Sequence, residues 1–276
     1  MKRLILLLIV FAAGQAVYAD TQDHTVASLD SVKTDSTKKK NRDIQFKVTW
    51  GKHDDREDKK DSVKHSSKHS GVSFDLTFSR FDLGFSKLID NGSFTLSSKN
   101  NFLEYNGWKT SNVGFDIVQF GYRFNSNFKV YLAGGFDWTH IRLQKDITIK
   151  RDWPELAWDQ DTIHFDKNRF SSTYLRIPLS FELRTKDDNN GKKFRFVFGP
   201  DMGFLLNGRV KQKSDERGKQ KFDDDYHFTK FRYGAFARIG YGGAGLYAKY
   251  YFNDTFENSP NQKGLRSMAF GITVGF

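Results

Sequence analysis

The sequence of 276 residues contains no cysteine, which excludes disulfide bonds, a thiolate nucleophile and cysteine ligands for a metal. After its first segment it has no run of 18 apolar residues, so no transmembrane helix is expected. It also lacks a P-loop and a dinucleotide-binding glycine motif that follows a strand. These absences argue against cysteine-based redox or metal chemistry, against the nucleotide-binding motifs named above and against a helical membrane protein.

The first 19 residues have the three parts of a secretory signal peptide. Lys2 and Arg3 are basic, residues 4–13 are apolar, and Val17-Tyr18-Ala19 fits a small-residue cleavage site. An uncleaved anchor helix is the alternative, but the apolar run is short and polar sequence follows it. The formal charge is +11, of which cleavage would remove two charges. We expect an exported basic chain to meet the anionic bacterial envelope and not nucleic acid.

Residues 20–71 are rich in Lys, Asp and Ser, as in TKKKNR and KHDDREDKKDSVKHSSKHS. Such a composition cannot bury enough apolar area to fold, so we predict a flexible polar leader in the periplasm. His65 and His69 have a metal-binding spacing only if this segment is helical, which its composition disfavours. Residues 44–50 alternate like a strand and are predicted to add one on the periplasmic side.

From residue 72 onward apolar residues recur every second position, which is the period of a β-strand. Helical spacing is not sustained anywhere in this region. We predict an all-β meander of eight strands, at residues 72–88, 111–124, 127–143, 171–185, 193–209, 229–241, 244–253 and 266–276.

One face of each predicted strand is apolar, and the other combines glycine with charge. In the fourth strand, for example, Leu175, Ile177 and Leu179 alternate with Arg176 and Ser180. A soluble barrel would bury the apolar face, whereas a membrane barrel turns it to lipid and fills its lumen with the polar face. The abundance of glycine on the polar face favours the membrane barrel, because strands exposed to water prefer β-formers. The predicted lumen charges are Asp137, Glu182, Asp201, Arg176, Arg184, Arg195, Arg232, Arg238 and Lys249.

The connections between strands alternate in length along the chain. Residues 125–126, 186–192 and 242–243 are short links, while residues 89–110, 144–170, 210–228 and 254–265 are long and polar. Outer-membrane barrels have short periplasmic turns, long external loops and an even number of strands. The pattern therefore predicts an eight-stranded antiparallel up-and-down transmembrane β-barrel over residues 72–276, located in the cell outer membrane.

Three irregularities interrupt the alternation. The first strand changes parity near Ser79-Arg80, which predicts a β-bulge, and the second strand is ambiguous in the same way. Pro178 and Gly199-Pro200 lie inside predicted strands, where proline cannot donate to the ladder. We predict a bulge at Gly199-Pro200 and a local break at Pro178.

The last predicted strand closes the barrel against the first and so removes the sheet edges. Met268, Phe270, Ile272, Val274 and Phe276 alternate with small residues and are expected to face lipid. The terminal aromatic resembles the signal by which insertion machinery recognises such barrels. A set of aromatic residues near the short links suits an inner interfacial girdle, namely Tyr122, Phe124, Phe128 and Tyr241.

Two motifs carry a resemblance to a known family: T-Y-L-R-I-P-L at residues 173–179 and R-Y-G-A-F-A-R-I-G-Y-G at residues 232–242. Together with KFRFVFGPDMGFLL and SMAFGITVGF, they resemble the porin-family, PorT-like outer-membrane barrels of Bacteroidota, within the OmpA/OmpX-like class of eight-stranded barrels. The resemblance covers residues 72–276. It implies an integral outer-membrane protein, generally without enzymatic activity.

The sequence offers two candidate acid/base pairs, Asp137 with His140, and Asp223-Asp224-Asp225 with His227. Neither is accompanied by a nucleophile at a fixed spacing, so we predict no catalytic, cofactor-binding or metal site and no cofactor. Trp153 and Trp158 lie in the second long loop, where they would either anchor a ligand or pack the loop onto its neighbours.

An eight-stranded barrel is just wide enough for side chains to fill it, so an open pore is not expected. We predict a structural role, binding through the surface loops, or docking in an envelope assembly. Outer-membrane lipid, the barrel insertion machinery, other envelope proteins and extracellular ligands are the expected partners. The alternatives are an enzyme that acts on envelope lipid at the outer rim and a soluble lipocalin-like barrel.

Overall fold

The computed structural model describes residues 45–48, 71–188 and 191–275. The chain divides into two units, Met1–Asn41 and Arg42–Phe276, and every described residue belongs to the second. The predicted signal peptide at 1–19, most of the predicted leader, His65, His69 and the terminal Phe276 lie outside the described residues.

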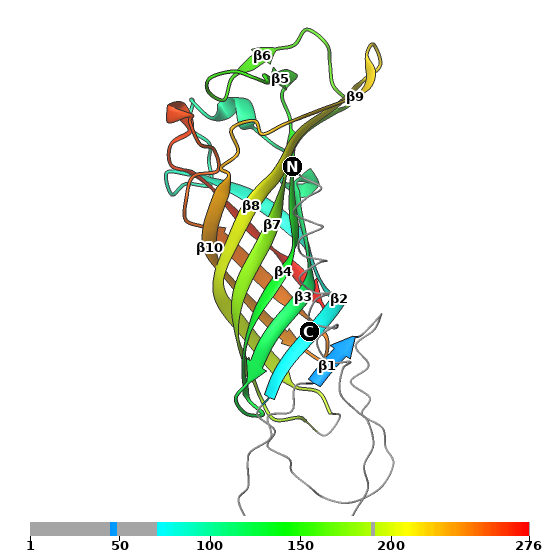
Figure 1. The fold of residues 1–276 in the computed structure, drawn as a ribbon. Helices are drawn as coiled ribbons and strands as arrows, with labels where there is room; N and C mark the ends of the chain where they lie inside the picture. Colours follow the sequence, from blue (N-terminus) through cyan, green and yellow to red (C-terminus); the bar gives the residue numbers. More distant parts are fainter. Residues whose placement is uncertain (1–44, 49–70, 189–190, 276) are drawn as a thin grey trace, which may run out of the picture. The chain divides into compact units, whose positions relative to one another are not determined.

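Eight antiparallel strands form a closed barrel (Figure 1). Each strand pairs with the next barrel strand along the chain, and the last, β12, pairs with the first, β2. Closure leaves the barrel without a free edge over the paired length. The eight strands are β2 (Gly71–Asp90), β3 (Ser111–Arg123), β4 (Phe128–Leu143), β7 (Lys167–Arg184), β8 (Phe194–Ser214), β10 (Phe231–Tyr241), β11 (Ala244–Tyr251) and β12 (Leu265–Val274).

All eight predicted strands are present, and two of them extend at one end by four or more residues beyond the predicted bounds. β7 begins four residues earlier than expected, at Lys167, and β8 continues five residues further, to Ser214. In these extensions the two strands pair with each other, and β8 also pairs with the short strand β9 (Gly218–Asp224). Lys and Arg replace apolar residues on the outward face there, so the alternation used for prediction stops before the pairing does.

The predicted bulge in the first strand is confirmed, because the register between β2 and β3 shifts between Leu76 and Arg80. A second shift, between Asp116 and Val118, explains the ambiguous parity of the second strand. Each extra residue restores a common outward face on both sides of the bulge.

The predicted bulge at Gly199-Pro200 is wrong. Both residues pair with β10 in unbroken register, opposite Phe236 and Ala235. The ladder between β4 and β7 omits Pro178 and its neighbour Ile177 without a change of register, which agrees with the predicted local break. The ladder between β7 and β8 has a similar gap at Gly199 and Pro200, again without a change of register. The missing proline N–H is therefore tolerated by a gap in one ladder and needs no inserted residue.

The predicted faces are confirmed by burial. Arg176, Arg238 and Lys249 are almost fully buried in the barrel, whereas Leu246 and Ile272 are more than half exposed. We call the outward-facing hydrophobic residues the apolar belt. Its members include Phe81, Leu83, Phe120, Leu132, Leu183, Phe196, Phe198, Phe204, Leu206, Phe231, Ile239, Leu246, Phe270, Ile272 and Val274.

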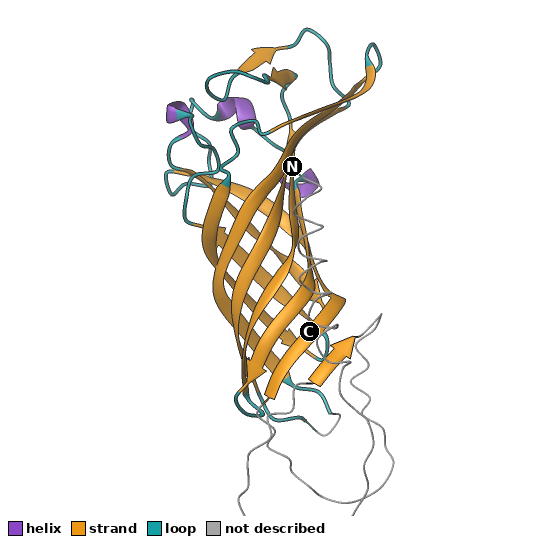
Figure 2. Ribbon diagram, in the orientation of Figure 1, coloured by secondary structure: helices purple, strands orange, loops and turns teal. Residues whose placement is uncertain are grey.

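The alternation of short links and long loops is also confirmed (Figure 2). The long loops carry short elements of their own: η1 (Asn101–Leu103), η2 (Gly107–Lys109), the hairpin of β5 (Ile147–Ile149) and β6 (Trp158–Gln160), and η3 (Pro260–Gln262). No helix in the described ranges is both long and apolar enough to cross a membrane.

The long loops and the strand ends beside them share a hydrophobic core, which we call the cap. Phe170 is fully buried at its centre, with the rings of Phe228 and Phe256 at centroid distances of 4.6 and 6.0 Å. The cap consists of Leu88, Phe102, Leu103, Ile141, Leu143, Ile147, Ile149, Leu156, Phe170, Val210, Tyr226, Phe228, Phe256 and Leu265. These loops were expected to be long and polar, and the structure shows that they fold together.

The strand predicted at residues 44–50 corresponds to β1 (Gln45–Val48). It pairs in parallel with the start of β2, with Gln45 opposite Ser73 and Val48 opposite Leu76. β12 pairs with β2 only from Phe81 onward. β1 therefore extends the sheet where the closing strand has already ended.

Candidate functional site

A network of buried charges fills the lumen of the barrel. Asp82 on β2 lies at its centre, with one oxygen 2.8 Å from Arg238, 3.0 Å from Lys249 and 3.2 Å from Arg176. Its other oxygen accepts a hydrogen bond from the hydroxyl of Thr273 at 2.8 Å. One carboxylate thus joins β2 to four other strands around the barrel.

Asp137 on β4 forms a second junction. It accepts hydrogen bonds from Arg232 and Lys249, both at 2.8 Å, and from Asn112 at 2.9 Å. Asp137 and Lys249 are almost fully buried. Removing one partner of such a pair would leave a buried charge without compensation, which costs several kcal/mol, typically about 3–5.

Arg232 is also held between two aromatic rings. Its guanidinium carbon lies 3.8 Å from the ring centre of Tyr174 and 4.1 Å from that of Tyr251. The hydroxyl of Tyr251 donates to Asp201, which pairs in turn with Arg176 at 3.3 Å. Aromatic rings and ion pairs together therefore form one connected filling of the lumen.

Glycine makes room for this filling. A Cβ atom added at Gly114 would lie 3.1 Å from both the Asp137 carboxylate and the Lys249 ammonium group. At Gly203 it would lie 3.0 Å from the guanidinium of Arg232. At these two positions glycine leaves room for charged side chains, whereas at Gly84, Gly135 and Gly234 a Cβ atom would meet the backbone of the neighbouring strand.

Several of the predicted lumen charges meet across the barrel, and the sequence-based prediction omitted others. Arg80, Asp82 and Asp116 all belong to the network, and Asp116 lies 3.5 Å from both Arg80 and Arg176. These residues flank the two bulges, at which the inward parity changes. If the apolar alternation of β2 and β3 is read with one extra residue at each bulge, it predicts that these side chains point inward.

The apolar belt, the charged lumen and the closed ring of eight strands agree with one comparison with known proteins. Residues 71–257 match the family described as outer membrane protein beta-barrel domain. The chain belongs to this family. No curated protein matches the chain in sequence.

Membership of the outer-membrane β-barrel family indicates which surface of the barrel contacts lipid and which end is external. The apolar belt is the surface that contacts lipid, and the long loops with the cap lie at the external end of the barrel. The soluble lipocalin-like alternative needs an apolar interior, whereas this barrel contains buried ion pairs between β2, β4, β7, β10 and β11.

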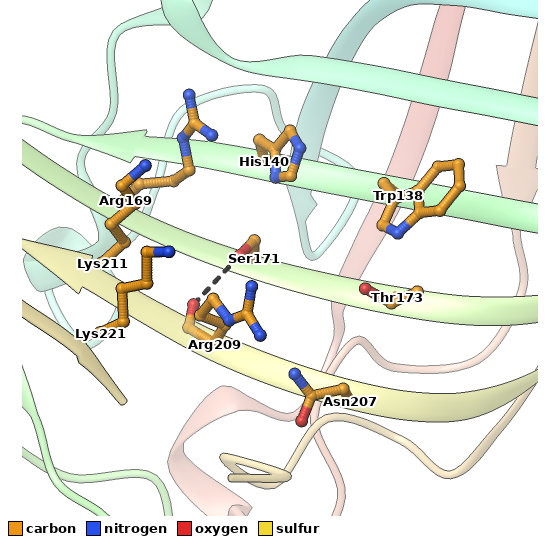
Figure 3. Close-up of a pocket in the computed structure, with 9 residues that line it drawn as sticks. All are labelled: Trp138, His140, Arg169, Ser171, Thr173, Asn207, Arg209, Lys211 and Lys221. Carbon is orange, nitrogen blue, oxygen red and sulfur yellow. Dashed lines mark hydrogen bonds between the residues drawn. The ribbon is translucent and has the colours of Figure 1, made fainter. Parts of the chain in front are cut away.

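The first candidate acid/base pair is not assembled in this outer-membrane barrel. Asp137 points into the lumen, while His140 lies three residues further along β4 on the outward face. His140 lines a surface pocket beyond the apolar belt, which ends on β4 at Trp138 (Figure 3). Burial and the nearby cations Arg169, Lys167 and Lys211 lower its pKa to about 4. His140 is therefore neutral at pH 7 and faces away from Asp137.

The second candidate pair is also separated. The ring of His227 contacts the backbone carbonyl of Trp153 at 2.7 Å, and Asp223 forms an ion pair with Arg209. Asp225 accepts a hydrogen bond from the backbone N–H of His227, so it shapes the turn and does not orient the imidazole. Within the described ranges no three His, Asp or Glu side chains converge to form a metal site.

The two loop tryptophans have different environments. Trp158 stacks on Phe102 with a centroid distance of 5.6 Å and so packs the second long loop onto the first. Trp153 is 50% exposed, and the ammonium group of Lys150 lies 4.5 Å from its ring centre. The packing interpretation thus holds for Trp158, while Trp153 presents an accessible aromatic surface.

Proposed function

We propose that the chain is an integral outer-membrane barrel that acts as a closed scaffold, holding its cap at the cell surface for docking to an envelope protein or an extracellular ligand. The observation that carries this proposal is the filled lumen combined with folded loops. A transport pore would need an open lumen, whereas a docking scaffold needs a rigid support for its loops.

Contacts between the loops support a rigid cap. The N–H of Leu156 in the second loop donates to Ser259 in the fourth at 3.0 Å. His227 of the third loop contacts the second loop, and Gln144 donates to the carbonyl of Glu104 in the first. A surface held by such cross-loop contacts loses little conformational entropy when it binds a partner.

The proposed role is non-enzymatic, since neither candidate acid/base pair is brought together. The insertion machinery and outer-membrane lipid remain expected partners of the barrel, and nucleic acid does not. The two sequence motifs at residues 173–179 and 232–242 favour the finer assignment to porin-family, PorT-like barrels of Bacteroidota.

In-cell photocrosslinking tests the docking role. A photoreactive phenylalanine analogue replaces Trp153 on the cap in one variant and Asn125 in a short link in a second variant. We expect the probe at position 153 to yield a discrete crosslinked product in the membrane fraction, and the probe at position 125 not to yield it. If the cap position gives no product, or the two positions give the same one, docking through the cap is wrong.

A further inference from the structure

The strand extensions beyond the apolar belt carry an unusual row of positive charge. Arg142 on β4 is opposite Arg169 on β7, which is opposite Lys211 on β8, which is opposite Lys221 on β9. We call these four residues the basic row. Like charges in directly opposed positions destabilise a sheet.

The basic row is poorly neutralised by the protein itself. Among the described residues, no carboxylate lies within ion-pair distance of Arg169, Lys211 or Lys221. The nearest acids are engaged elsewhere, since Asp223 pairs with Arg209 and Asp166 with Lys213. The positive charges repel one another: Lys219, Arg169 and Lys221 all lower the pKa of Lys211.

Protection of a sheet edge does not explain this row. Lysines on an edge strand prevent edge-to-edge aggregation, which would account for Lys221 on β9. Arg169 and Lys211 lie on β7 and β8, which are paired on both sides at these positions. Their charge therefore requires another explanation.

The row borders a pocket with a volume of about 410 Å³ (Figure 3). Trp138 and Thr173 line its side nearest the apolar belt, and Arg169, Lys211 and Lys221 line the opposite side. Asn207 adds an amide beside Thr173, and Ser171 adds a hydroxyl between the two sides (Figure 3). The pocket thus places cationic and neutral hydrogen-bonding groups directly beyond the surface that contacts lipid.

The distance from the belt matches the position of lipid headgroups. Arg142 follows Trp138 by four residues, which is about 13 Å along a strand. Barrel strands tilt by about 35–45°, so this corresponds to about 10 Å along the membrane normal. The headgroup layer extends about 5–8 Å beyond the hydrocarbon core, within reach of long Arg and Lys side chains.

We propose that the basic row and its pocket bind the phosphate groups of a phosphorylated lipid in the outer leaflet, while the acyl chains of that lipid lie along the apolar belt. The inference rests on the outer-membrane placement of the barrel and is independent of docking through the cap. Guanidinium and ammonium groups are the preferred partners of phosphate oxygens, and Trp138 lies where the headgroup meets the acyl chains.

Native mass spectrometry of the whole detergent-solubilised protein tests the proposal. The probes are an acylated diglucosamine lipid with two phosphates, the same lipid without phosphates, and inorganic phosphate. The variant Arg169→Gln/Lys211→Gln/Lys221→Gln removes three charges from the site. Lys186→Gln/Lys192→Gln/Lys193→Gln removes three from the short link and serves as its control.

We expect the wild type to bind the phosphorylated lipid in preference to the other two probes. With about a fivefold contribution from each basic residue, the site variant should bind about 100-fold more weakly, and the control should bind like the wild type. Equal losses in both variants would mean general electrostatic attraction, and equal binding of the unphosphorylated lipid would mean apolar contact; either result overturns the proposal. Inorganic phosphate that displaces the lipid at equal affinity would overturn its lipid part.

Partition of each protein between detergent-rich and aqueous phases distinguishes a failure of the outer-membrane placement from a failure of the lipid site. Wild type and both variants should enter the detergent-rich phase. Aqueous wild type would contradict the outer-membrane placement itself. Protein that enters the detergent-rich phase but binds no phosphorylated lipid contradicts only the lipid site.

Discussion

At the scale of single residues, the carboxylate of Asp82 connects several strands of the barrel. Its carboxylate contacts Arg176, Arg238 and Lys249, and all four side chains are at most 1% exposed. These contacts join positions 94 to 167 residues apart along the chain, so the junction forms only when the barrel closes. Such a junction stabilises the closed ring and specifies which strands lie opposite one another.

Asp82→Asn should lower the free energy of unfolding by about 3–5 kcal/mol, because an isosteric amide leaves the three cations without their shared anion. Denaturant titration of the purified protein in detergent micelles measures the change. Asp159→Asn is the matched control, since Asp159 forms an exposed pair with Lys150 at 2.9 Å and should cost less than about 1 kcal/mol. If both variants unfold at the same denaturant concentration, the lumen network does not have the proposed role.

The sequence predicted most lumen charges but not their centre. Arg176, Arg232 and Lys249 follow the regular alternation of their strands, so their inward direction could be inferred. Asp82 and Asp116 lie beside bulges, and one extra residue reverses the assignment of every position after it. Which acid meets which base depends on barrel closure, and local periodicity contains no information about that.

At the scale of elements, the extensions of β7 and β8 have two different faces. Their inward side contributes Phe170 and Val210 to the cap, and Gln212 donates to the backbone carbonyl of Ile147 in the β5–β6 hairpin at 3.1 Å. Their outward side carries Arg169 and Lys211, the two central residues of the basic row. The extensions therefore link the membrane barrel to its folded loops.

Phe170→Ala should open the cap and leave the barrel closed. Loss of a fully buried phenylalanine costs about 3–5 kcal/mol, which would raise the population of open loops about 100-fold or more. Limited trypsin digestion should then cut the second and third long loops faster, while the barrel stays resistant. Trp153→Ala changes an exposed aromatic residue of the same loops and should leave the digestion rate unaltered; equal acceleration in both variants would contradict a shared cap core.

The predicted strands and the unpredicted cap differ for a physical reason. A strand of a barrel repeats its pattern every two residues over ten or more positions, as in β10, so the signal is local and redundant. The cap uses a few separated hydrophobic residues from each loop, such as Leu103, Leu156 and Phe256, within long polar stretches. Their partners come from other loops, and no periodicity marks them in the sequence.

At the scale of the whole barrel, two independent layers close the lumen. The charged network fills the membrane-spanning part, and the cap packs across the external strand ends. Either layer alone would hinder the passage of ions. Together they favour a scaffold over a channel, and the charged network is the layer that a substitution can open without a change in the loops.

Reconstituted in planar lipid bilayers, the wild-type protein should give no stepwise ion conductance. Asp82→Ala/Arg238→Ala removes an ion-paired acid and base together, so it empties part of the lumen without adding net charge. We expect this variant to show small conductance steps, because water can then enter the space that the two side chains filled. Resistance of the cap to external trypsin verifies that both proteins are inserted and folded. Steady conductance of the wild type, equal to that of the variant, would mean that the barrel is a pore and that the closed-scaffold role is wrong.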